Sequence, residues 1–189
     1  MPSVKPVTPE SLGSQTVGPY YAIGLDYLVN ETLAAPNVAG RHITLSGTVF
    51  DANHQPIPDA ILELWQASAD GTYSDLHPSA NFSGFTRLST HDQGRFKVHT
   101  IEPGSVPYLD GRPQAPHIVV LLFMRGLMRH LVTRIYFPDH PLNNSDPILH
   151  LIPPHRRSTL IARTASPDSR ELYWDIHLQG PKETVFFEC

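Results

Sequence analysis

Proline is the residue that most restricts how this chain can fold. Nineteen of the 189 residues are proline, roughly twice the share in an average soluble protein. Because proline fixes its own φ angle and has no amide hydrogen to donate, it interrupts helices and the interiors of sheets. The composition therefore disfavours long helices and favours a turn-rich, mostly β architecture.

From residue 41 onward, short apolar segments alternate with turn residues. Apolar and polar residues alternate in segment 42–50 (HITLSGTVF), which is the period of two expected for a half-buried strand. Segment 117–123 (HIVVLLF) is almost wholly apolar, which is typical of a strand buried on both faces. Further strands are expected at 60–66, 95–100, 131–137, 172–178 and 184–187, and the only helical candidate is 145–152. This pattern predicts an all-β fold, a β-sandwich of about eight short strands with an extended N-terminal arm.

The arm comprises residues 1–40, and the sandwich core comprises residues 41–189. Segment 16–23 of the arm (TVGPYYAI) is strongly apolar, and its aromatic side chains would be exposed to water in a free tail. We therefore expect this segment to pack against the body of the protein or against a partner.

Charge and cysteine content exclude several classes of protein. The formal net charge is −4 with histidine neutral, which argues against a protein that coats nucleic acid or a membrane surface. The single cysteine, Cys189, cannot form an internal disulfide, and a reducing compartment is the simplest interpretation. The start of the chain does not resemble a signal peptide, and no segment approaches the ~18 apolar residues of a membrane span. We expect a cytoplasmic, soluble protein.

Eleven histidines raise the question of a metal site. The motifs His-Glu-x-x-His, Cys-x-x-Cys and His-x-His are absent from the sequence, and most histidines fall in predicted turns, where a surface role is favoured. His117 differs because it begins the most apolar strand. It is either a core histidine bonded to the backbone, which we favour, or a ligand.

Arg125 follows the same apolar strand, in the sequence Phe123-Met124-Arg125-Gly126. A guanidinium at a strand end can face a cleft and bind an anion. The alternative is a salt-bridged or solvated arginine, and the residues alone leave both interpretations open.

In combination, several motifs resemble the intradiol ring-cleaving dioxygenases, which open catechols with ferric iron. The resemblance covers about residues 8–187 and is strong in the combined order of its motifs rather than in any one of them. The motifs are 46–51 (SGTVFD), 56–60 (PIPDA), 64–67 (LWQA), 71–73 (GTY), 101–104 (IEPG), 115–118 (APHI), 133–137 (TRIYF) and 146–149 (DPIL).

The resemblance implies four iron ligands, two tyrosines and two histidines, and this sequence departs from that set. Tyr73 and His117 match the first tyrosine and the first histidine, but the second tyrosine is replaced by Val106 and the second histidine by Val119. The family's arginine three residues before the first histidine appears as Gln114. Valine has no donor atom, so we expect this chain alone to hold no catalytic iron and the site to be degenerate.

Within the family, the chain resembles the α subunit of a hetero-oligomeric enzyme whose homologous β subunit binds Fe(III). The resemblance implies that the arm docks on that β partner. It also implies that five residues line the partner's pocket for protocatechuate (3,4-dihydroxybenzoate), namely Thr16, Gly18, Pro19, Tyr20 and Arg125. The implied reaction with O₂ yields 3-carboxy-cis,cis-muconate, a step of aromatic-compound catabolism in the β-ketoadipate pathway. No catalytic residue is expected on this chain itself.

Three hypotheses about function remain. The favoured one is the non-catalytic α subunit just described. A self-sufficient ferric catechol-type dioxygenase is opposed by Val106 and Val119. A non-enzymatic β-sandwich interaction module would be compatible with the strand pattern alone.

Overall fold

Strand β1, His42–Phe50, lies inside the larger of two sheets and coincides with the first predicted strand. The computed structural model describes residues 13–74 and 81–188, so the first twelve residues of the predicted arm and Cys189 lie outside it. β1 pairs antiparallel with one neighbour and parallel with two. The other strands of this sheet are β4 (Arg95–Ile101), β9 (Arg163–Thr164), β10 (Glu171–Tyr173) and β11 (Ile176–His177).

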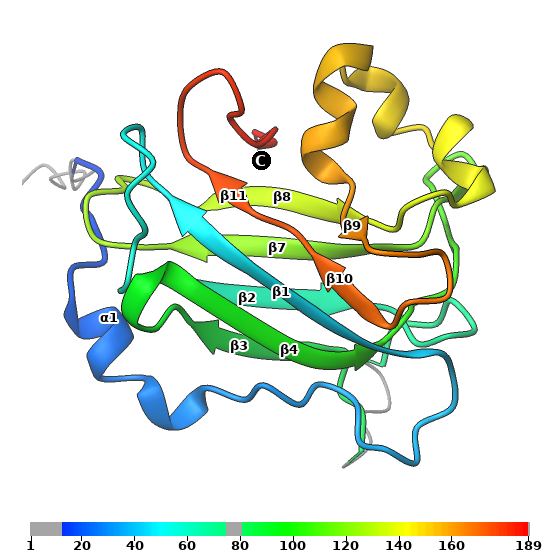
Figure 1. Cartoon of the computed structure of the whole chain (residues 1–189), viewed down its shortest axis with the longest axis horizontal. Helices are drawn as coiled ribbons and strands as arrows, with labels where there is room; N and C mark the ends of the chain where they lie inside the picture. The colour runs from blue at the N-terminus through cyan, green and yellow to red at the C-terminus, as the bar shows by residue number, and fades with distance from the viewer. Residues whose placement is uncertain (1–12, 75–80, 189) are drawn as a thin grey trace, which may run out of the picture.

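The second sheet has four antiparallel strands in the order β3-β2-β7-β8. Its strands are β2 (Ile61–Gln66), β3 (Phe85–Ser89), β7 (His117–Phe123) and β8 (Leu131–Tyr136). A two-stranded ribbon, β5 (Val106–Pro107) with β6 (Pro113–Gln114), precedes β7 in the chain. Figure 1 shows the sheet that contains β1 in front of the sheet that contains β7. The predicted all-β sandwich is confirmed.

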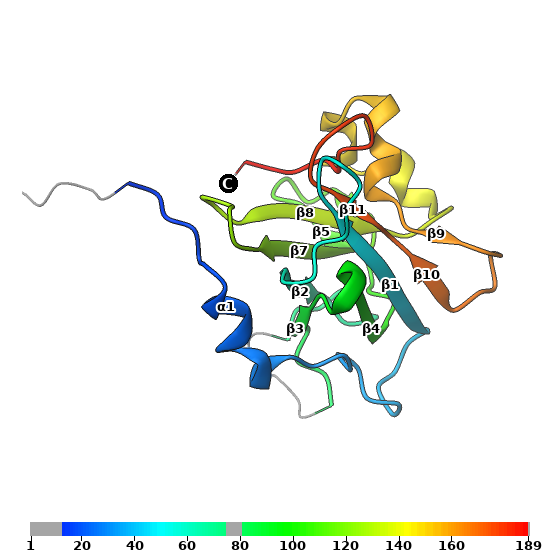
Figure 2. The same ribbon diagram turned by 60° about the vertical axis from the view of Figure 1, so that its left-hand side comes forward.

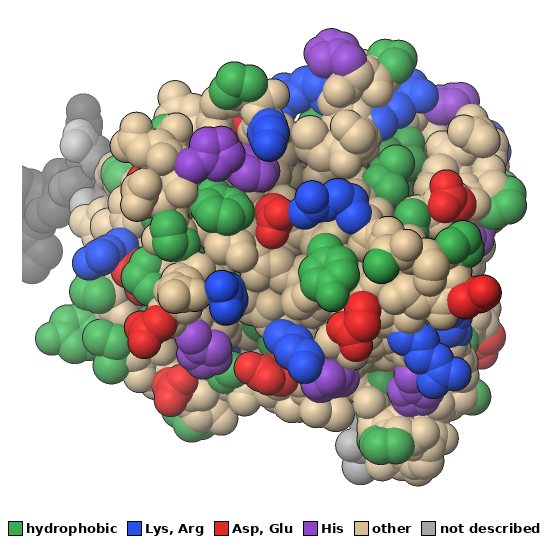
Figure 3. Space-filling view, viewed as in Figure 1, with side chains coloured by type: hydrophobic (Ala, Val, Ile, Leu, Met, Phe, Trp, Pro, Cys, Tyr) green, Lys and Arg blue, Asp and Glu red, His purple; other side chains and the backbone are tan. Residues whose placement is uncertain are grey.

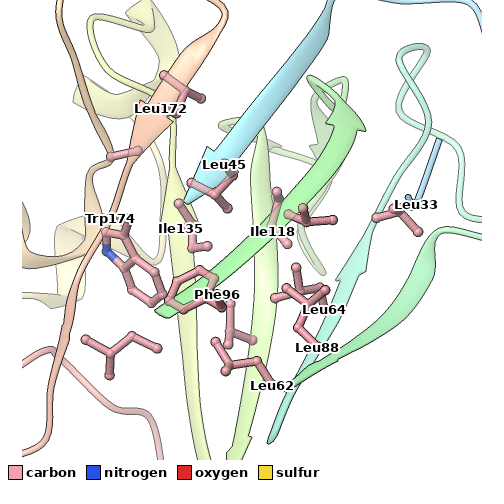
Figure 4. Packing of buried hydrophobic residues seen from close by; sticks show 14 of the residues in the cluster. Leu33, Leu45, Leu62, Leu64, Leu88, Phe96, Ile118, Ile135, Leu172 and Trp174 are labelled. Atoms are coloured by element: carbon pink, nitrogen blue, oxygen red, sulfur yellow. The ribbon is translucent and has the colours of Figure 1, made fainter. Parts of the chain in front are cut away.

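The hydrophobic core lies between these two sheets (Figure 4). Leu45 from β1, Ile118 from β7 and Trp174 from the β10–β11 segment all belong to it and are almost completely buried. Gly47 allows the backbone of β1 to approach the β10–β11 segment closely, because a Cβ atom at this position would lie 1.8 Å from the Trp174 carbonyl oxygen. Burial of these side chains is the main force that holds the sheets together.

In residues 13–74 and 81–188, helical structure is restricted to short turns. One four-residue α-helix, α1 (Tyr20–Ile23), lies in the arm, at the side of the sandwich (Figure 2). The 3₁₀ turns are η1 (Asp26–Leu28), η2 (Asp92–Gly94), η3 (Pro141–Asn144), η4 (Leu149–Leu151) and η5 (Pro154–Leu160). Within the part of the chain that the model describes, no helix is long and apolar enough to cross a membrane.

The helix expected at 145–152 is wrong, because the only helical element within that range is the three-residue 3₁₀ turn η4. Pro147 supplies no amide hydrogen, and the Asp146 carboxylate accepts the amide hydrogens of Ile148 and Leu149 at 2.9 and 2.8 Å. The carboxylate thus caps a short turn rather than starting a long helix. Around this turn lies a second small core cluster that contains Leu149, Leu160 and Tyr136.

Three details of the strand prediction are corrected. Segment 172–178 is split into β10 and β11, although Leu172, Trp174 and Ile176 are buried alternately as expected. Segment 184–187 forms only a single bridge, between Phe187 and Val132. β7 was expected to be buried on both faces. Only its inner face is fully buried, because Val119 on the outer face is partly exposed.

β3 was not predicted, because its alternation is inverted. Thr86 points inward and is 4% exposed, whereas the aromatic Phe85 points outward and is 47% exposed. The pattern of apolar residues therefore gave no signal for this strand.

Candidate functional site

The outer face of the β3-β2-β7-β8 sheet collects the residues of the predicted degenerate centre. Side chains alternate along β7, so His117 and Val119 point away from the core that Ile118 joins. Their cross-strand partners on β8 are Tyr136 for His117 and Arg134 for Val119. Residues opposite each other in antiparallel strands share a face. The four side chains therefore form one cluster at the start of β7.

His117 is a buried histidine held by the backbone. It is 4% exposed, and its Nδ1 lies 2.7 Å from the carbonyl oxygen of Ala115. Burial lowers the pKa of His117 to about 4, and the positive charge of Arg134 acts in the same direction. The imidazole is therefore neutral at pH 7, as in the favoured interpretation of a core histidine bonded to the backbone.

The two valines lie where the resemblance requires donors. Val106 is buried in β5, and its ribbon partner is Gln114 in β6. The Gln114 Oε1 accepts a hydrogen bond from Nη1 of Arg134 at 2.8 Å. A guanidinium thus lies beside the positions that a metal would need.

Tyr73 is half-buried in the loop after β2, where its ring packs edge-on against Trp65 with centroids 6.0 Å apart. Burial raises the pKa of the Tyr73 phenol, whereas the charge of Arg134 opposes this rise. Tyr73 and His117 therefore both lie within the electrostatic range of one arginine.

Ferric iron does not fit this set of side chains. The four positions offer one phenol, one imidazole and two aliphatic groups, whereas iron of this type is held by several oxygen and nitrogen donors. No group of three or more His, Cys, Asp or Glu that could hold a metal occurs in residues 13–74 and 81–188.

A second group of predicted site residues meets at the other end of β7. The amide of Gly126 donates to the hydroxyl oxygen of Thr16 at 2.8 Å, and that hydroxyl lies 3.5 Å from the carbonyl oxygen of Met124. The arm therefore lies beside the segment that carries Arg125. We call this corner of the molecule, formed by Thr16–Tyr20 and Met124–Gly126, the arm corner.

The arm turns sharply within this corner. Gly18 has φ +70°, in the left-handed region where glycine is favoured. Pro19 follows and caps α1, which begins at Tyr20. The Tyr20 side chain is 80% exposed, and apolar side chains gather at the left edge of Figure 3, over α1. The left-handed glycine and the proline together bend the arm at this point.

Arg125 is salt-bridged and largely exposed, which is the second of the two interpretations that the residues left open. Its Nε lies 2.7 Å from Oδ2 of Asp59, and its side chain remains 63% exposed. This is the closest contact between the two side chains, and most of the guanidinium side chain remains accessible to a second anion.

The contacts that fix the arm to the sheet were missed by the sequence analysis. The Tyr21 hydroxyl donates to Glu63 Oε1 at 3.3 Å, and the ring lies 5.1 Å from that of Phe123. Arg87 forms an ion pair with Glu63 and lies 5.4 Å from the Tyr21 ring centroid. Burial raises the pKa of Tyr21, and Glu63 adds to the rise. A signal was present for Glu63, a charged residue within the apolar segment 60–66, but not for Arg87, whose segment 85–89 is mostly polar.

Comparison with known proteins gives similarities over nearly the whole chain. The Dioxygenase family model matches residues 17–180. The protocatechuate 3,4-dioxygenase alpha chain of Pseudomonas putida is 44% identical over 93% of this chain and 94% of its own length. The beta chain from Burkholderia cepacia is 33% identical over 91% of this chain and 77% of its own length.

A solved structure shows the same fold. The dioxygenase domain of a dioxygenase and carbohydrate-binding protein fusion from Streptomyces sp. SirexAA-E superposes with a TM-score of 0.63. The match covers 95% of this chain and 98% of that domain at 26% identity. The fold of this chain therefore occurs in a known dioxygenase domain.

Proposed function

Because the chain belongs to the family of intradiol ring-cleavage dioxygenases, we propose that it is the α subunit of a protocatechuate 3,4-dioxygenase. Intradiol dioxygenases use ferric iron. In this proposal the iron is bound by a homologous β subunit, and the two chains assemble as an αβ hetero-oligomer. The α chain contributes one wall of the substrate pocket.

The observation that carries the proposal is the composition of the degenerate centre. Val106 and Val119 have no donor atoms, and Arg134 places a positive charge beside them. This chain therefore lacks the means to hold the iron on which the reaction of the family depends. Its contribution is to binding rather than to the chemical step.

Arg125 has the chemistry to bind the carboxylate of protocatechuate. Asp59 Oδ2 lies 2.7 Å from Nε, which orients the guanidinium while the side chain stays 63% exposed. A charge-assisted, bidentate contact with a carboxylate is favoured by this geometry. It contributes roughly 1.5–3 kcal/mol, which corresponds to about 10- to 150-fold in affinity.

The arm supplies the rest of this wall. Thr16 is bonded to Gly126, so the arm and Arg125 are held next to each other. Gly18 lets the backbone turn, and Pro19 fixes the turn in place. The exposed Tyr20 has no cover within the described residues, and we assign its ring to the partner's pocket, where it excludes water from the substrate.

The proposed reaction is the insertion of both atoms of O₂ between the two hydroxyl-bearing carbons, which gives 3-carboxy-cis,cis-muconate. The partner's ferric centre supplies the chemistry of oxygen addition. The side chains of the α chain bind and orient the substrate, and orientation alone is a substantial part of enzymatic rate enhancement.

The proposal is tested by co-expression with an iron-bearing β homologue. We expect the two chains to copurify and to cleave protocatechuate, and the β chain alone to have a higher KM or no activity. If this chain purified alone cleaves protocatechuate, it is a self-sufficient dioxygenase. If it neither binds the β chain nor changes its kinetics, it is an interaction module, and in either case the proposal is wrong.

A further inference from the structure

Arg134 lies among the four positions that the family uses for iron. It is the cross-strand partner of Val119 in the β7–β8 pair. Its Nη1 donates to Oε1 of Gln114, and Gln114 is the ribbon partner of Val106. The same Nη1 lies 3.4 Å from the hydroxyl of Tyr136, the cross-strand partner of His117. Val119 is thus directly opposite Arg134. Val106 and His117 are each opposite a residue that contacts its guanidinium.

The guanidinium is held in place by a buried polar network. The Tyr136 hydroxyl donates to Oδ1 of Asp146 at 3.3 Å. Asp146 is fully buried, and its carboxylate also accepts the amides of Ala115, Ile148 and Leu149 at 2.7–2.9 Å. A network in which every member is satisfied is rigid. Arg134 therefore cannot move away without leaving Tyr136 and Gln114 short of a partner.

The positive charge of Arg134 is permanent, because a guanidinium stays protonated at every physiological pH.

We propose that Arg134 takes the place of the metal, so that the degenerate centre is a fixed-cation site that excludes metal ions even when their donors are restored. The proposal uses the assignment of the four ligand positions and in that respect rests on the proposed function. It gives a second reason, besides the missing donor atoms at positions 106 and 119, for this chain not to bind iron. A trivalent ion about 5 Å from a fixed unit charge is repelled strongly enough to reduce its affinity by roughly 50-fold, even in a water-like dielectric.

The test adds the missing donors with and without the cation. Three full-length variants are compared, namely Val106→Tyr/Val119→His, the same pair with Arg134→Gln, and the same pair with Arg129→Gln. Arg129 is an exposed arginine in the hairpin loop at the opposite end of β7, so its removal controls for net charge. Iron per chain is measured by metal analysis, and the visible tyrosinate-to-iron band reports ligation.

We expect the variant that lacks Arg134 to bind Fe(III) at least roughly 50-fold more tightly than the other two. Equal binding by all three would overturn this inference and leave the proposed function intact. Uptake of iron by the unaltered chain would contradict the proposed function as well. The two failures are therefore distinguishable.

A second measurement avoids the case in which the triple variants fail to fold. Arg134→Ala is heated with and without millimolar guanidinium chloride, and sodium chloride of equal ionic strength serves as the salt control. We expect guanidinium to raise the Tm of Arg134→Ala but not that of Arg129→Ala. The absence of a specific rise would contradict the fixed-cation site.

Discussion

The two ends of strand β7 differ in how their polar groups are used. At its start, His117 and Tyr136 are buried and bonded within the chain, and Arg134 is bonded to both Gln114 and Tyr136. Beyond its end, Arg125 is paired with Asp59 but its side chain is largely exposed. A site whose donors are all satisfied internally is structural, whereas one whose donors face outward can bind. The difference supports the proposal that the arm corner is the binding site of this chain.

The largest effect is expected from the network at the start of β7. Asp146→Ala removes the acceptor of three backbone amides and of the Tyr136 hydroxyl. Unpaired buried donors cost about 1–3 kcal/mol each, so we expect a loss of at least about 3 kcal/mol in the free energy of unfolding. Urea denaturation measures this loss.

Asp168→Ala is the matched control, because Asp168 is exposed and has no hydrogen bond in the described residues. It should change the free energy of unfolding by less than about 0.5 kcal/mol. Equal effects of the two variants would show that the buried network is not structural.

The same end of β7 should make stability depend on pH. The pKa of His117 is lowered to about 4 in the folded chain by burial and is about 6.5 when unfolded. Between these values the unfolded chain binds a proton that the folded chain does not, so stability falls as the pH decreases from 6.5 to 4. The contribution is fully present above pH 6.5 and amounts to about 3 kcal/mol.

Urea denaturation at pH 7 and pH 4.5 measures this dependence. His117→Asn keeps a donor near the Ala115 carbonyl and cannot titrate, so it should lose stability less steeply over this range. Identical slopes for the variant and the unaltered chain would mean that His117 is protonated in the folded state.

At the arm corner, Arg125→Ala is expected to weaken substrate binding in the assembled αβ enzyme. The lost carboxylate contact should raise the KM for protocatechuate by about 10- to 150-fold. Iron content should stay the same, because Arg125 lies outside the partner's metal site in the proposed function. Arg129→Ala, which removes an exposed arginine four residues away, is the control and should leave KM unchanged. Unchanged kinetics in Arg125→Ala would remove this residue from the pocket.

A smaller effect is expected from the anchor of the arm. Tyr21→Ala loses both the hydrogen bond to Glu63 and the ring contact with Phe123, which together contribute roughly 1–3 kcal/mol. We expect KM in the αβ enzyme to rise by roughly five-fold or more, with kcat changed less. Tyr21→Phe keeps the ring and should have about half of the effect in free energy. If both variants match the unaltered enzyme, the anchor does not position the arm.

Most of the sandwich could be predicted from the sequence, because burial on one face produces the period of two that marks β1 and β4. β3 escaped because it turns a threonine inward and a phenylalanine outward. The residues of the degenerate centre could be placed by resemblance. Arg134 could not, because only the register of β7 against β8 shows that its charge lies opposite Val119.

The same limit applies to the arm corner. The sequence indicated that Arg125 follows an apolar strand, but Asp59 is 66 residues earlier in the chain, and only the folded sheets bring the two together. Contacts between residues far apart in the sequence depend on strand order, which local patterns do not contain.

The central claim is that this chain supports catalysis without holding iron. The most direct test is to purify the assembled αβ enzyme, separate its chains under conditions that retain the metal, and measure iron in each. We predict that all of the iron stays with the β chain, and that this chain expressed alone contains none and is colourless. Iron and a tyrosinate band in this chain alone, together with cleavage of protocatechuate, would contradict the account.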